Sequence, residues 1–348
     1  MEAMVQQLCQ ANPGVPEERV REYLLERLRM QADREYPQSF RSCLDGIDAD
    51  PTAEQSGLRA SCHCGHCTFE VVCGRTLGVP RKLVRCHCSS CRRYHASAFG
   101  TFIPAERSSL PTDLSFGGKA RSARHICSAL GSLERIFCGE CFAKLMVVVL
   151  DGEHAGENYV CAGVLVDDTI PTALALTWQV AFDDLESCQR ASWWSATPSD
   201  RESMGPRRSI MVEGGCACGT CRFSAALFPG EVQHCYCNLC RRLSGAASQS
   251  WIPCSNEAFH WKGRESLRLV RTTRHGQRHV CTSCGCVMTI VYDSQPDCTW
   301  PVAGVLDDAS LPRDLDDLWY RVIHICCSMM QPWLQLPDDG LPRLKYAG

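Results

Sequence analysis

Cysteines at short, repeated spacings are the residues of this chain whose chemistry is easiest to infer. The sequence has 27 cysteines in 348 residues. A C-x-C-x-x-C group, a second C-x-C-x-x-C group and a C-x-x-C group follow one another, and this series occurs twice. Deprotonated cysteine binds zinc, which takes four sulfurs in a closed structural site and three protein ligands where one position stays open. The spacing therefore predicts several metal centres.

The two series have the same order, and the segments between them also correspond. Phe102-Ile103-Pro104 matches Trp251-Ile252-Pro253, and Ala162-Gly163-Val164-Leu165 matches Ala303-Gly304-Val305-Leu306. The period is about 150 residues, the size of a whole domain, so we infer a tandem duplication. The grouped cysteines of the first repeat are Cys62, Cys64, Cys67, Cys86, Cys88, Cys91, Cys138 and Cys141, and those of the second are Cys216, Cys218, Cys221, Cys235, Cys237, Cys240, Cys281 and Cys284.

Each repeat thus offers eight sulfurs, which can be divided in two ways. A C-x-x-C pair needs a second pair from a distant segment to complete a tetrahedron, which gives a closed structural site. A C-x-C-x-x-C group brings three sulfurs together within one loop and leaves a position for a thiol or water. Spacing alone does not say which group is the open one, and it also permits two closed four-cysteine sites. The spacing differs from that of common ferredoxins, which disfavours an iron–sulfur cluster.

Composition limits the classes of protein that this chain can represent. The hydrophobic share of 45 % and charged share of 22 % are ordinary for a globular chain. The longest apolar run, Leu145–Leu150, is far shorter than the roughly 20 residues of a membrane-spanning helix. The net charge of −3, without a basic block, gives no reason to expect nucleic-acid binding.

The cysteine content also bears on the cellular compartment. The start, MEAMVQQLCQ, lacks the features of a secretory signal, and the cysteine count is odd. We therefore expect a reducing compartment, the cytoplasm with the nucleus as an alternative, in which grouped thiols bind metal rather than form disulfides.

Short strands must position the cysteine groups, because the segments between them are rich in β-branched and aromatic residues and are bounded by Gly, Pro or Asp. We expect mainly β domains, with one amphipathic helix near residues 16–30. The predicted strands are Thr68–Val72, Ala98–Ile103, Lys144–Leu150, Val160–Val166 and Ala173–Phe182, then Arg222–Ala226, Ser248–Ile252, Val287–Tyr292, Val302–Leu306 and Trp319–Cys326.

The repeats and the segments around them define the expected domains. Residues 1–57 form a helical extension and connector, 58–194 the first domain, 195–212 a linker and 213–348 the second domain. Pairing of the two domains within the chain is also open.

The ordered motifs G-x-C-x-C-G-x-C-x-F, C-x-C-x-x-C-R-R and C-x-x-C-G resemble the glutathione-dependent formaldehyde-activating enzyme family, which includes centromere protein V. The resemblance covers most of residues 60–190 and 213–345. It implies two tandem zinc-clamped β-tent domains of the Mss4-like type and up to four Zn²⁺ ions. It implies closed sites at Cys62, Cys64, Cys138 and Cys141 and at Cys216, Cys218, Cys281 and Cys284, and open catalytic sites at Cys86, Cys88 and Cys91 and at Cys235, Cys237 and Cys240.

The two repeats differ from the family pattern to different extents. The second has Gly245 and Gly285 and ends with His324, Trp333 and Leu341-Pro342, similar to the family's closing pattern. In the first repeat, His95 and Phe142 occupy the glycine positions, and Asp183 is the nearest match to His324. Larger side chains would narrow the space over an open metal position, so we expect the second repeat to be the catalytic one.

The resemblance implies carbon–sulfur lyase-type chemistry, in which a glutathione-like thiol and a small electrophile are joined or cleaved. Arg241 is a candidate for substrate binding and His324 for acid–base catalysis. Two alternatives remain: a lyase, cyclase or dehydratase that acts without glutathione, and a non-catalytic zinc-binding module.

Other residues near the cysteine groups have a structural interpretation beside the functional one. Arg92, Arg93, Arg241 and Arg242 could bind glutathione carboxylates or instead offset thiolate charge, and His63, His66 and His87 could replace a ligand. Cys67 and Cys221 are left over from the implied ligand sets. Cys161, Cys298 and the Cys326-Cys327 pair are most simply buried apolar residues.

Overall fold

The computed structural model describes most of both repeats. The described residues are 58–71, 83–105, 122–127, 133–151, 155–166, 178–181, 209–227, 231–311, 321–331, 333–334, 336 and 341–346. The helix predicted near residues 16–30 lies outside these ranges, as do the connector up to residue 57 and most of the linker. No helix among the described residues has both the length and the apolar character needed to cross a membrane.

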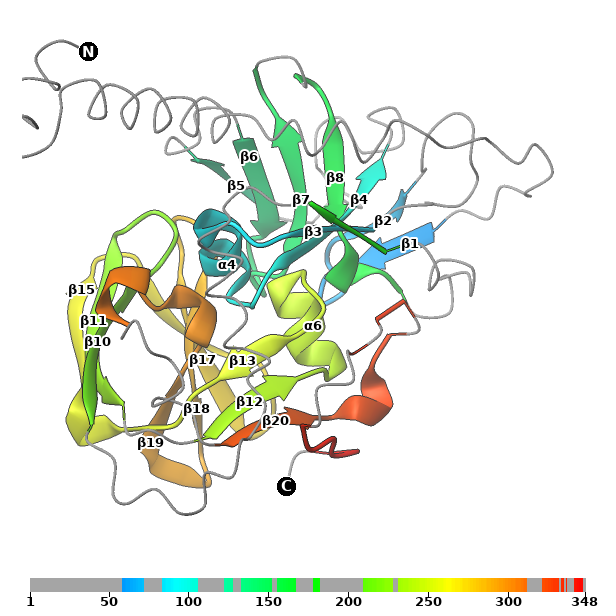
Figure 1. Ribbon diagram of the computed structural model, residues 1–348. Coiled ribbons are helices and arrows are strands. Elements are labelled where there is room, and N and C mark those ends of the chain that lie inside the picture. The colour runs from blue at the N-terminus through cyan, green and yellow to red at the C-terminus, as the bar shows by residue number, and fades with distance from the viewer. Residues whose placement is uncertain are drawn as a thin grey trace, which may run out of the picture. The chain divides into compact units, whose positions relative to one another are not determined.

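The first repeat consists of a hairpin and a seven-stranded sheet with the order β5-β6-β7-β8-β4-β3-β9 (Figure 1). Neighbouring strands are antiparallel except for β3 and β9, which run parallel. The strands are β1 Leu58–Ser61, β2 Thr68–Val71, β3 Leu83–Cys86, β4 Gly100–Ala105, β5 Ser122–Cys127, β6 Leu133–Cys138, β7 Lys144–Val149, β8 Asn158–Cys161 and β9 Trp178–Ala181.

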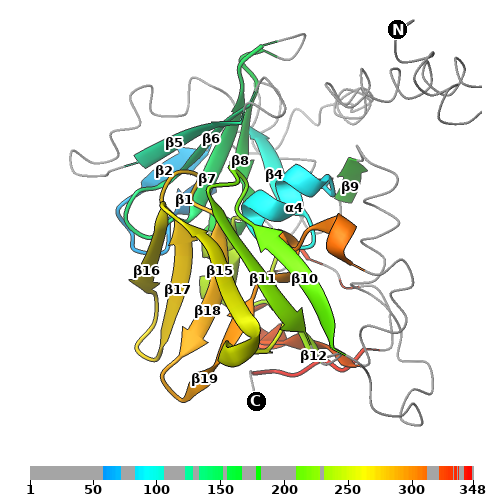
Figure 2. The same ribbon diagram turned by 90° about the vertical axis from the view of Figure 1, so that its left-hand side faces the viewer.

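The second repeat contains three sheets, with the orders β10-β11-β15, β13-β12-β20 and β14-β19-β18-β17-β16 (Figure 2). The β12–β20 pair is parallel, like β3–β9 in the first repeat. The strands are β10 Ile210–Gly215, β11 Cys221–Leu227, β12 Glu231–Cys235, β13 Gln249–Trp251, β14 Cys254–Ser255, β15 Phe259–Arg264, β16 Leu267–Arg271, β17 Gly276–Cys281, β18 Val287–Tyr292, β19 Gln295–Pro301 and β20 Arg321–Ile325.

The expectation of a mainly β chain is confirmed. The segment Val287–Tyr292 is a strand with the predicted limits, and the one predicted at Lys144–Leu150 ends one residue earlier. The prediction was wrong at the end of Val160–Val166 and at Val302–Leu306. There the chain forms the short 3-10 helices η4 (Ala162–Val164) and η10 (Ala303–Val305). An apolar run of this length does not by itself distinguish a strand from a tight helical turn.

Two short helices, α4 (Ser89–His95) and α6 (Asn238–Ser244), were not predicted from the sequence. Each begins within a middle cysteine group, and the sulfur of the N-cap cysteine accepts a hydrogen bond from a backbone N–H in the first turn. Each ends at a left-handed residue, Ala96 or Gly245. Seven residues are too few to show a helical period, so capping rather than patterning determines these helices.

The two repeats contact each other in a reciprocal way. Helix α6 of the second repeat packs on η4 of the first, and α4 packs on η10. A Cβ atom on Gly163 would lie 2.5 Å from the carbonyl oxygen of Arg241, and one on Gly304 would lie 2.6 Å from the backbone nitrogen of Ser97. Glycine is required at both positions because two backbone segments approach closely.

Polar contacts extend this contact between the repeats. The Gly163 N–H donates to the Gly245 carbonyl at 2.9 Å, and Nδ1 of His95 lies 2.6 Å from the Ser244 carbonyl oxygen. Arg92 forms an ion pair with Asp308 at 2.6 Å. Residues 47–348 form one compact unit, so the domain limits at 194 and 213 stay a prediction.

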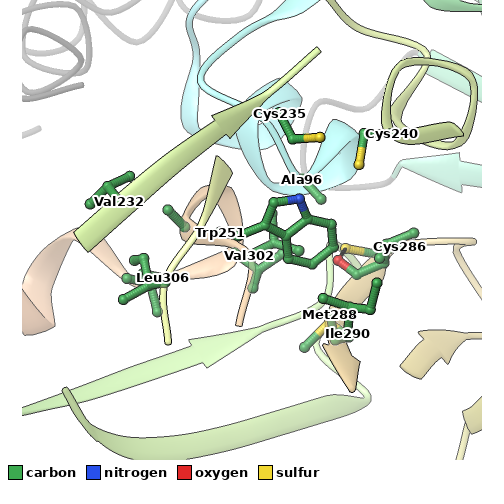
Figure 3. Packing of buried hydrophobic residues seen from close by; sticks show 14 of the residues in the cluster. Ala96, Val232, Cys235, Cys240, Trp251, Cys286, Met288, Ile290, Val302 and Leu306 are labelled. Atoms are coloured by element: carbon green, nitrogen blue, oxygen red, sulfur yellow. Dashed lines mark hydrogen bonds between the residues drawn. The ribbon is translucent and has the colours of Figure 1, made fainter. Parts of the chain in front are cut away.

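The hydrophobic core of the second repeat includes side chains from the first. Trp251 is 3 % exposed and belongs to the same buried cluster as Ala96 and Phe137. Figure 3 shows the Trp251 indole next to Ala96, with the side chains of Cys235 and Cys240 on the same side of the ring. Residues at the contact between the repeats and cysteines of the middle group therefore belong to one hydrophobic core.

Candidate metal centres

Four cysteines from distant segments converge in each repeat. Their sulfurs lie within 4.8 Å of one another in two groups, which are Cys62, Cys64, Cys138 and Cys141, and Cys216, Cys218, Cys281 and Cys284. The Sγ atoms of Cys62 and Cys64 are 3.5 Å apart, and those of Cys216 and Cys218 are 3.4 Å apart. Four sulfurs around one zinc at about 2.3 Å would be separated by about 3.8 Å. Both groups therefore fit a tetrahedral metal ion.

A tight turn builds the first half of each four-cysteine group. Gly65 and Gly219 have φ of +79° and +82°, which a glycine adopts without strain. The turn also directs a backbone N–H at a sulfur: Cys67 N donates to Cys62 Sγ at 3.2 Å, and Cys221 N donates to Cys216 Sγ at the same distance. Cys67 and Cys221 are thus positioned beside the groups through their backbone.

The second half of each four-cysteine group lies in a β-hairpin turn, between β6 and β7 or between β17 and β18. Phe142 and Gly285 follow the second cysteine of the turn with φ of +62° and +72°. Their N–H groups donate to the carbonyls of Cys138 and Cys281 at 2.9 and 2.8 Å. A phenylalanine with a left-handed backbone is uncommon. Phe142 nevertheless adopts it, so the first repeat has the same turn as the second.

The middle cysteine groups each bring three sulfurs together. Among the described residues these groups are Cys86, Cys88 and Cys91, and Cys235, Cys237 and Cys240. The first cysteine ends a strand, β3 or β12, and the other two lie at the start of a helix. The Sγ atoms of Cys86 and Cys88 are 3.4 Å apart, and Cys240 N donates to Cys237 Sγ at 3.4 Å. Three sulfurs can hold a metal ion and leave one position for an external ligand.

In each group one sulfur is stabilised as a thiolate by its neighbours. The pKa of Cys88 lies well below the usual range because the Cys86 and Cys91 thiols donate to it. The pKa of Cys237 is lowered in the same way, by Cys235, Cys240 and also by Cys326. A metal ion would take the place of the shared protons and hold all the sulfurs as thiolates.

A buried arginine faces the third cysteine of each middle group. Arg135 and Arg278 are each 1 % exposed. Nη2 of Arg278 lies 3.5 Å from Cys240 Sγ, and Nη2 of Arg135 lies 4.0 Å from Cys91 Sγ. Their guanidinium groups stack on aromatic rings, Arg135 on Tyr94 at 4.4 Å and Arg278 on Trp251 at 5.3 Å.

A buried cation this close to Cys91 or Cys240 would offset the negative charge that the sulfur carries once a metal ion is bound. Among the described residues, no carboxylate pairs with Arg278. The sequence analysis missed these arginines, although each stands three residues before the C-x-x-C pair in its repeat.

His324 lies beside the middle group of the second repeat. It is 4 % exposed, and its Nδ1 lies 2.8 Å from the hydroxyl oxygen of Tyr236, the residue between Cys235 and Cys237. In the strand register, Cys235 is level with Ile325 and Cys86 with Ala181. The position of His324 in the first repeat is therefore that of Val180, and not Asp183 as the sequence suggested.

The structure directs Arg241 away from the cysteine sulfurs and toward the first repeat. It is 1 % exposed, and its Nη1 donates to the carbonyls of Gly163 and Leu165 at 2.8 and 3.0 Å. Substrate binding by Arg241 would require these buried bonds to break, so its geometry supports a role between the repeats. Arg92 is placed similarly by its ion pair with Asp308, and Arg93 pairs with Asp307 at 2.8 Å.

The expectation that Gly245 and Gly285 widen the space over a metal was wrong. A Cβ atom on Gly245 would meet Lys144 and Cys161 at 2.8 and 2.9 Å, and one on Gly285 would meet the Phe137 ring at 2.7 Å. Both glycines thus face the first repeat. The counterpart of Gly245 is Ala96, the left-handed residue that ends α4, and not His95 as the sequence suggested. The two middle sites differ instead at the positions of His324 and Tyr236.

The three candidate histidine ligands have different surroundings. Nδ1 of His66 lies 3.1 Å from Cys64 Sγ, next to a group that already has four sulfurs. Nε2 of His63 lies 3.3 Å from the Thr272 carbonyl oxygen of the second repeat. Burial lowers the pKa of His87 to about 4, and its ring packs against Phe99.

Comparison with known proteins gives two matches in this chain to one family model. The model is described as glutathione-dependent formaldehyde-activating enzyme, and it matches residues 57–179 and 211–322. The crystal structure of a Rhodobacter sphaeroides protein is 23 % identical, with 31 % of this chain and 97 % of that chain covered and a TM-score of 0.25. No curated protein matches the chain. The paired family matches confirm the tandem duplication.

Proposed function

Because the chain belongs to the glutathione-dependent formaldehyde-activating enzyme family, we propose that it is a zinc-dependent carbon–sulfur lyase-type enzyme that joins or cleaves a thiol and a small electrophile. The family is zinc-binding and glutathione-related, and its fold is a β-tent. The two repeats of this mainly β chain are tandem copies of that fold. The thiol we propose is glutathione or a close analogue.

The contrast between the two kinds of cysteine group carries the proposal. Each repeat has one group of four sulfurs, which fills a tetrahedral coordination sphere, and one of three, which does not. We assign a structural zinc to each four-cysteine group and a reactive zinc to each three-cysteine group, up to four ions per chain. Three thiolates make zinc a weaker Lewis acid than three histidines would, which favours thiol chemistry over demanding hydrolysis.

We assign the principal reaction to the second repeat, at Cys235, Cys237 and Cys240. A zinc ion bound there would lower the pKa of a thiol in its open position and orient that thiol. The end of β12 and the first turn of α6 fix the three sulfurs. Arg278 offsets the negative charge that three thiolates and a substrate thiolate would bring into a buried site.

A proton must move in the reaction that we propose. In the forward direction the thiolate sulfur forms a bond to the carbonyl carbon of an aldehyde, and the carbonyl oxygen takes up a proton. In the reverse direction the carbon–sulfur bond breaks and that proton returns. We assign this proton transfer to His324, whose contact with Tyr236 links it to the cysteine loop. Val180 holds the matching position in the first repeat, and it cannot transfer a proton.

We further propose that the partners are small molecules and that the protein acts in the cytoplasm. Grouped thiols in a chain with 27 cysteines bind metal best where they stay reduced. The sequence, with a net charge of −3, contains no basic block that would favour nucleic-acid binding.

Matched knockouts of the two middle groups test the proposal. Cys237→Ser and Cys88→Ser are compared with the unchanged chain for zinc content, for heat on titration with glutathione, and for turnover of glutathione with formaldehyde. We expect each variant to lose about one zinc, and Cys237→Ser to lose most of the turnover. Equal losses would show that the first repeat is an equal partner. Absence of any glutathione response in the unchanged chain would favour an enzyme that uses another substrate.

A further inference from the structure

A fourth sulfur lies beside the three-cysteine group of the second repeat. The Sγ atom of Cys326 is 4.0 Å from that of Cys235, and Cys326 is 7 % exposed. Cys326 does not belong to the set of sulfurs that all lie within 4.8 Å of one another. A rotation of its side chain is therefore needed before its sulfur can share a metal ion with the other three.

The fold holds Cys326 at this place from both sides. It directly follows β20, whose last residue Ile325 is level with Cys235 in the parallel register. The next residue, Cys327, donates its N–H to the Leu344 carbonyl at 3.0 Å, and Leu344 N donates to the His324 carbonyl at 2.8 Å. The C-terminal segment thus fixes the backbone on either side of Cys326.

The backbone of Cys326 is unusual for a residue with a side chain. Its φ of +58° and ψ of +34° place it in the left-handed region, which residues other than glycine and asparagine seldom adopt. Such a conformation persists only where the surroundings impose it. Here it ends the strand so that the Cys326 thiol stays next to the cysteine loop.

In the first repeat, the sequence position that corresponds to Cys326 does not hold a cysteine. By the strand register, the residue that follows Ala181 corresponds to Cys326, and in the sequence it is Phe182. Among the described residues, the group around Cys86 has three members. Among the described residues, the two middle groups thus differ in the number of sulfurs nearby, three in the first repeat and four in the second.

We propose that Cys326 is the fourth ligand of the metal at Cys235, Cys237 and Cys240, so that a thiolate of the protein itself closes this site until a substrate thiol replaces it. In the exchange, the incoming thiol gives up its proton as its sulfur binds, and the Cys326 thiolate takes up a proton as it leaves. This inference rests on the proposed function, because it requires a metal in the middle group.

The closure has a direct consequence for the two repeats. An exchangeable internal thiolate shields the metal of the second repeat from water and from unwanted ligands, and it admits only a ligand that competes with a thiolate. At the middle site of the first repeat no such fourth sulfur lies among the described residues, so we expect that site to admit other small ligands. Substrate selection in the second repeat therefore begins with thiol exchange.

Cadmium-113 NMR of the full-length protein tests this inference, because the chemical shift of bound cadmium reports how many sulfurs bind it. Zinc is replaced by cadmium in the unchanged chain, in Cys326→Ser and in the control Cys327→Ser. The unchanged chain should give three signals typical of four sulfurs and one typical of three. Cys326→Ser should move one signal to the three-sulfur range, and Cys327→Ser should leave all four signals in place. Cys237→Ser identifies the signal of the second middle site.

The outcomes separate this inference from the proposed function. Two signals of each kind in the unchanged chain, with no change in Cys326→Ser, would overturn the inference and leave four metal centres intact. A spectrum in which Cys237→Ser neither removes nor shifts any signal would overturn both. The spectrum of the unchanged chain decides the matter even if Cys326→Ser fails to fold. Cys326→Ser should also bind glutathione several-fold more tightly, since no internal thiolate competes.

Discussion

The role that we assign to each grouped cysteine depends on how many other sulfurs and which cations lie around its sulfur. Cys62 and Cys216 each have three sulfur neighbours, one from the same turn and two from a distant hairpin. A metal ion bound there would therefore connect segments that are far apart in the sequence. Cys91 and Cys240 have two sulfur neighbours from the same loop and a buried arginine nearby. A metal in such a loop adds little to the closure of the fold, because the helix and strand beside it already hold the loop.

At the residue scale, we predict that the two kinds of cysteine differ in their effect on folding. Cys284→Ser should unfold the second repeat, because a structural zinc contributes roughly 10 kcal/mol or more of apparent binding free energy. Cys237→Ser should keep its β signature and lose up to one zinc together with activity. Circular dichroism and metal analysis measure both. A soluble Cys284→Ser variant with full metal content and unchanged thermal stability would contradict the prediction.

Arg241 gives a second prediction at this scale. Arg241→Gln removes the donor of two buried carbonyls, Gly163 and Leu165, and each unsatisfied group costs about 1–3 kcal/mol. We expect the free energy of unfolding to fall by about 3 kcal/mol and turnover per folded, zinc-loaded molecule to stay within about twofold. Denaturant unfolding and steady-state kinetics measure these effects, with exposed Arg268→Gln as the control. A large loss of turnover at unchanged stability would assign Arg241 to substrate binding.

At the scale of elements, the helices and 3-10 turns connect the metal groups to the contact between the repeats. Helix α4 begins at a cysteine sulfur and ends where the backbone meets η10, and α6 does the same with η4. Seven residues thus span the distance from a middle cysteine group to the other repeat. Each contact between the repeats therefore includes a helix that also carries cysteines of a middle group.

Gly163→Ala tests this coupling between elements. The new Cβ would lie 2.5 Å from the Arg241 carbonyl oxygen, a backbone atom that cannot move without α6. We expect a loss of about 1–3 kcal/mol of stability, as for other overpacked sites. Exposed Met211→Ala is the control, and denaturant unfolding is the measurement. An unchanged midpoint for Gly163→Ala would show that η4 and α6 are further apart in solution.

At the scale of the whole molecule, each repeat covers residues of the other that would otherwise be exposed. Lys144 of the first repeat is fully buried and donates to the Gly285 carbonyl of the second. The Cys286 thiol lies 3.0 Å from the Arg93 carbonyl oxygen of the first repeat. The duplicated sequence has therefore diverged into two halves that fit each other, and Gly245 and Gly285 of the second repeat correspond to Ala96 and Phe142 of the first.

Separation of the halves tests this mutual dependence. Residues 195–348 produced alone should aggregate or have a much lower melting temperature, because the surface around Gly245, Gly285 and Gly304 loses its cover. Production together with residues 1–194 should restore a soluble one-to-one complex. Size-exclusion chromatography with light scattering and thermal unfolding measure both results. A monomeric second half as stable as the intact chain would refute the dependence.

Local features of the sequence were sufficient to predict the cysteine groups that could hold metal in this protein. The three cysteine spacings, their repetition and the strand pattern depend on residues a few positions apart, so they predicted the metal groups, the duplication and a mainly β fold. The family resemblance, itself carried by local motifs, implied which cysteines combine across distant segments. The structure contains four cysteine groups, two of four sulfurs and two of three, and each consists of the cysteines that the resemblance implied.

Tertiary structure decided what those local features could not. Gly245 and Arg241 look like parts of a reactive site in the sequence, yet they meet residues about 80 or more positions away in the first repeat. Cys326 looks like one more apolar cysteine until parallel pairing of β12 and β20 brings it beside Cys235. The physical reason is that strand register and the packing of one repeat on the other, rather than spacing along the chain, determine which side chains meet.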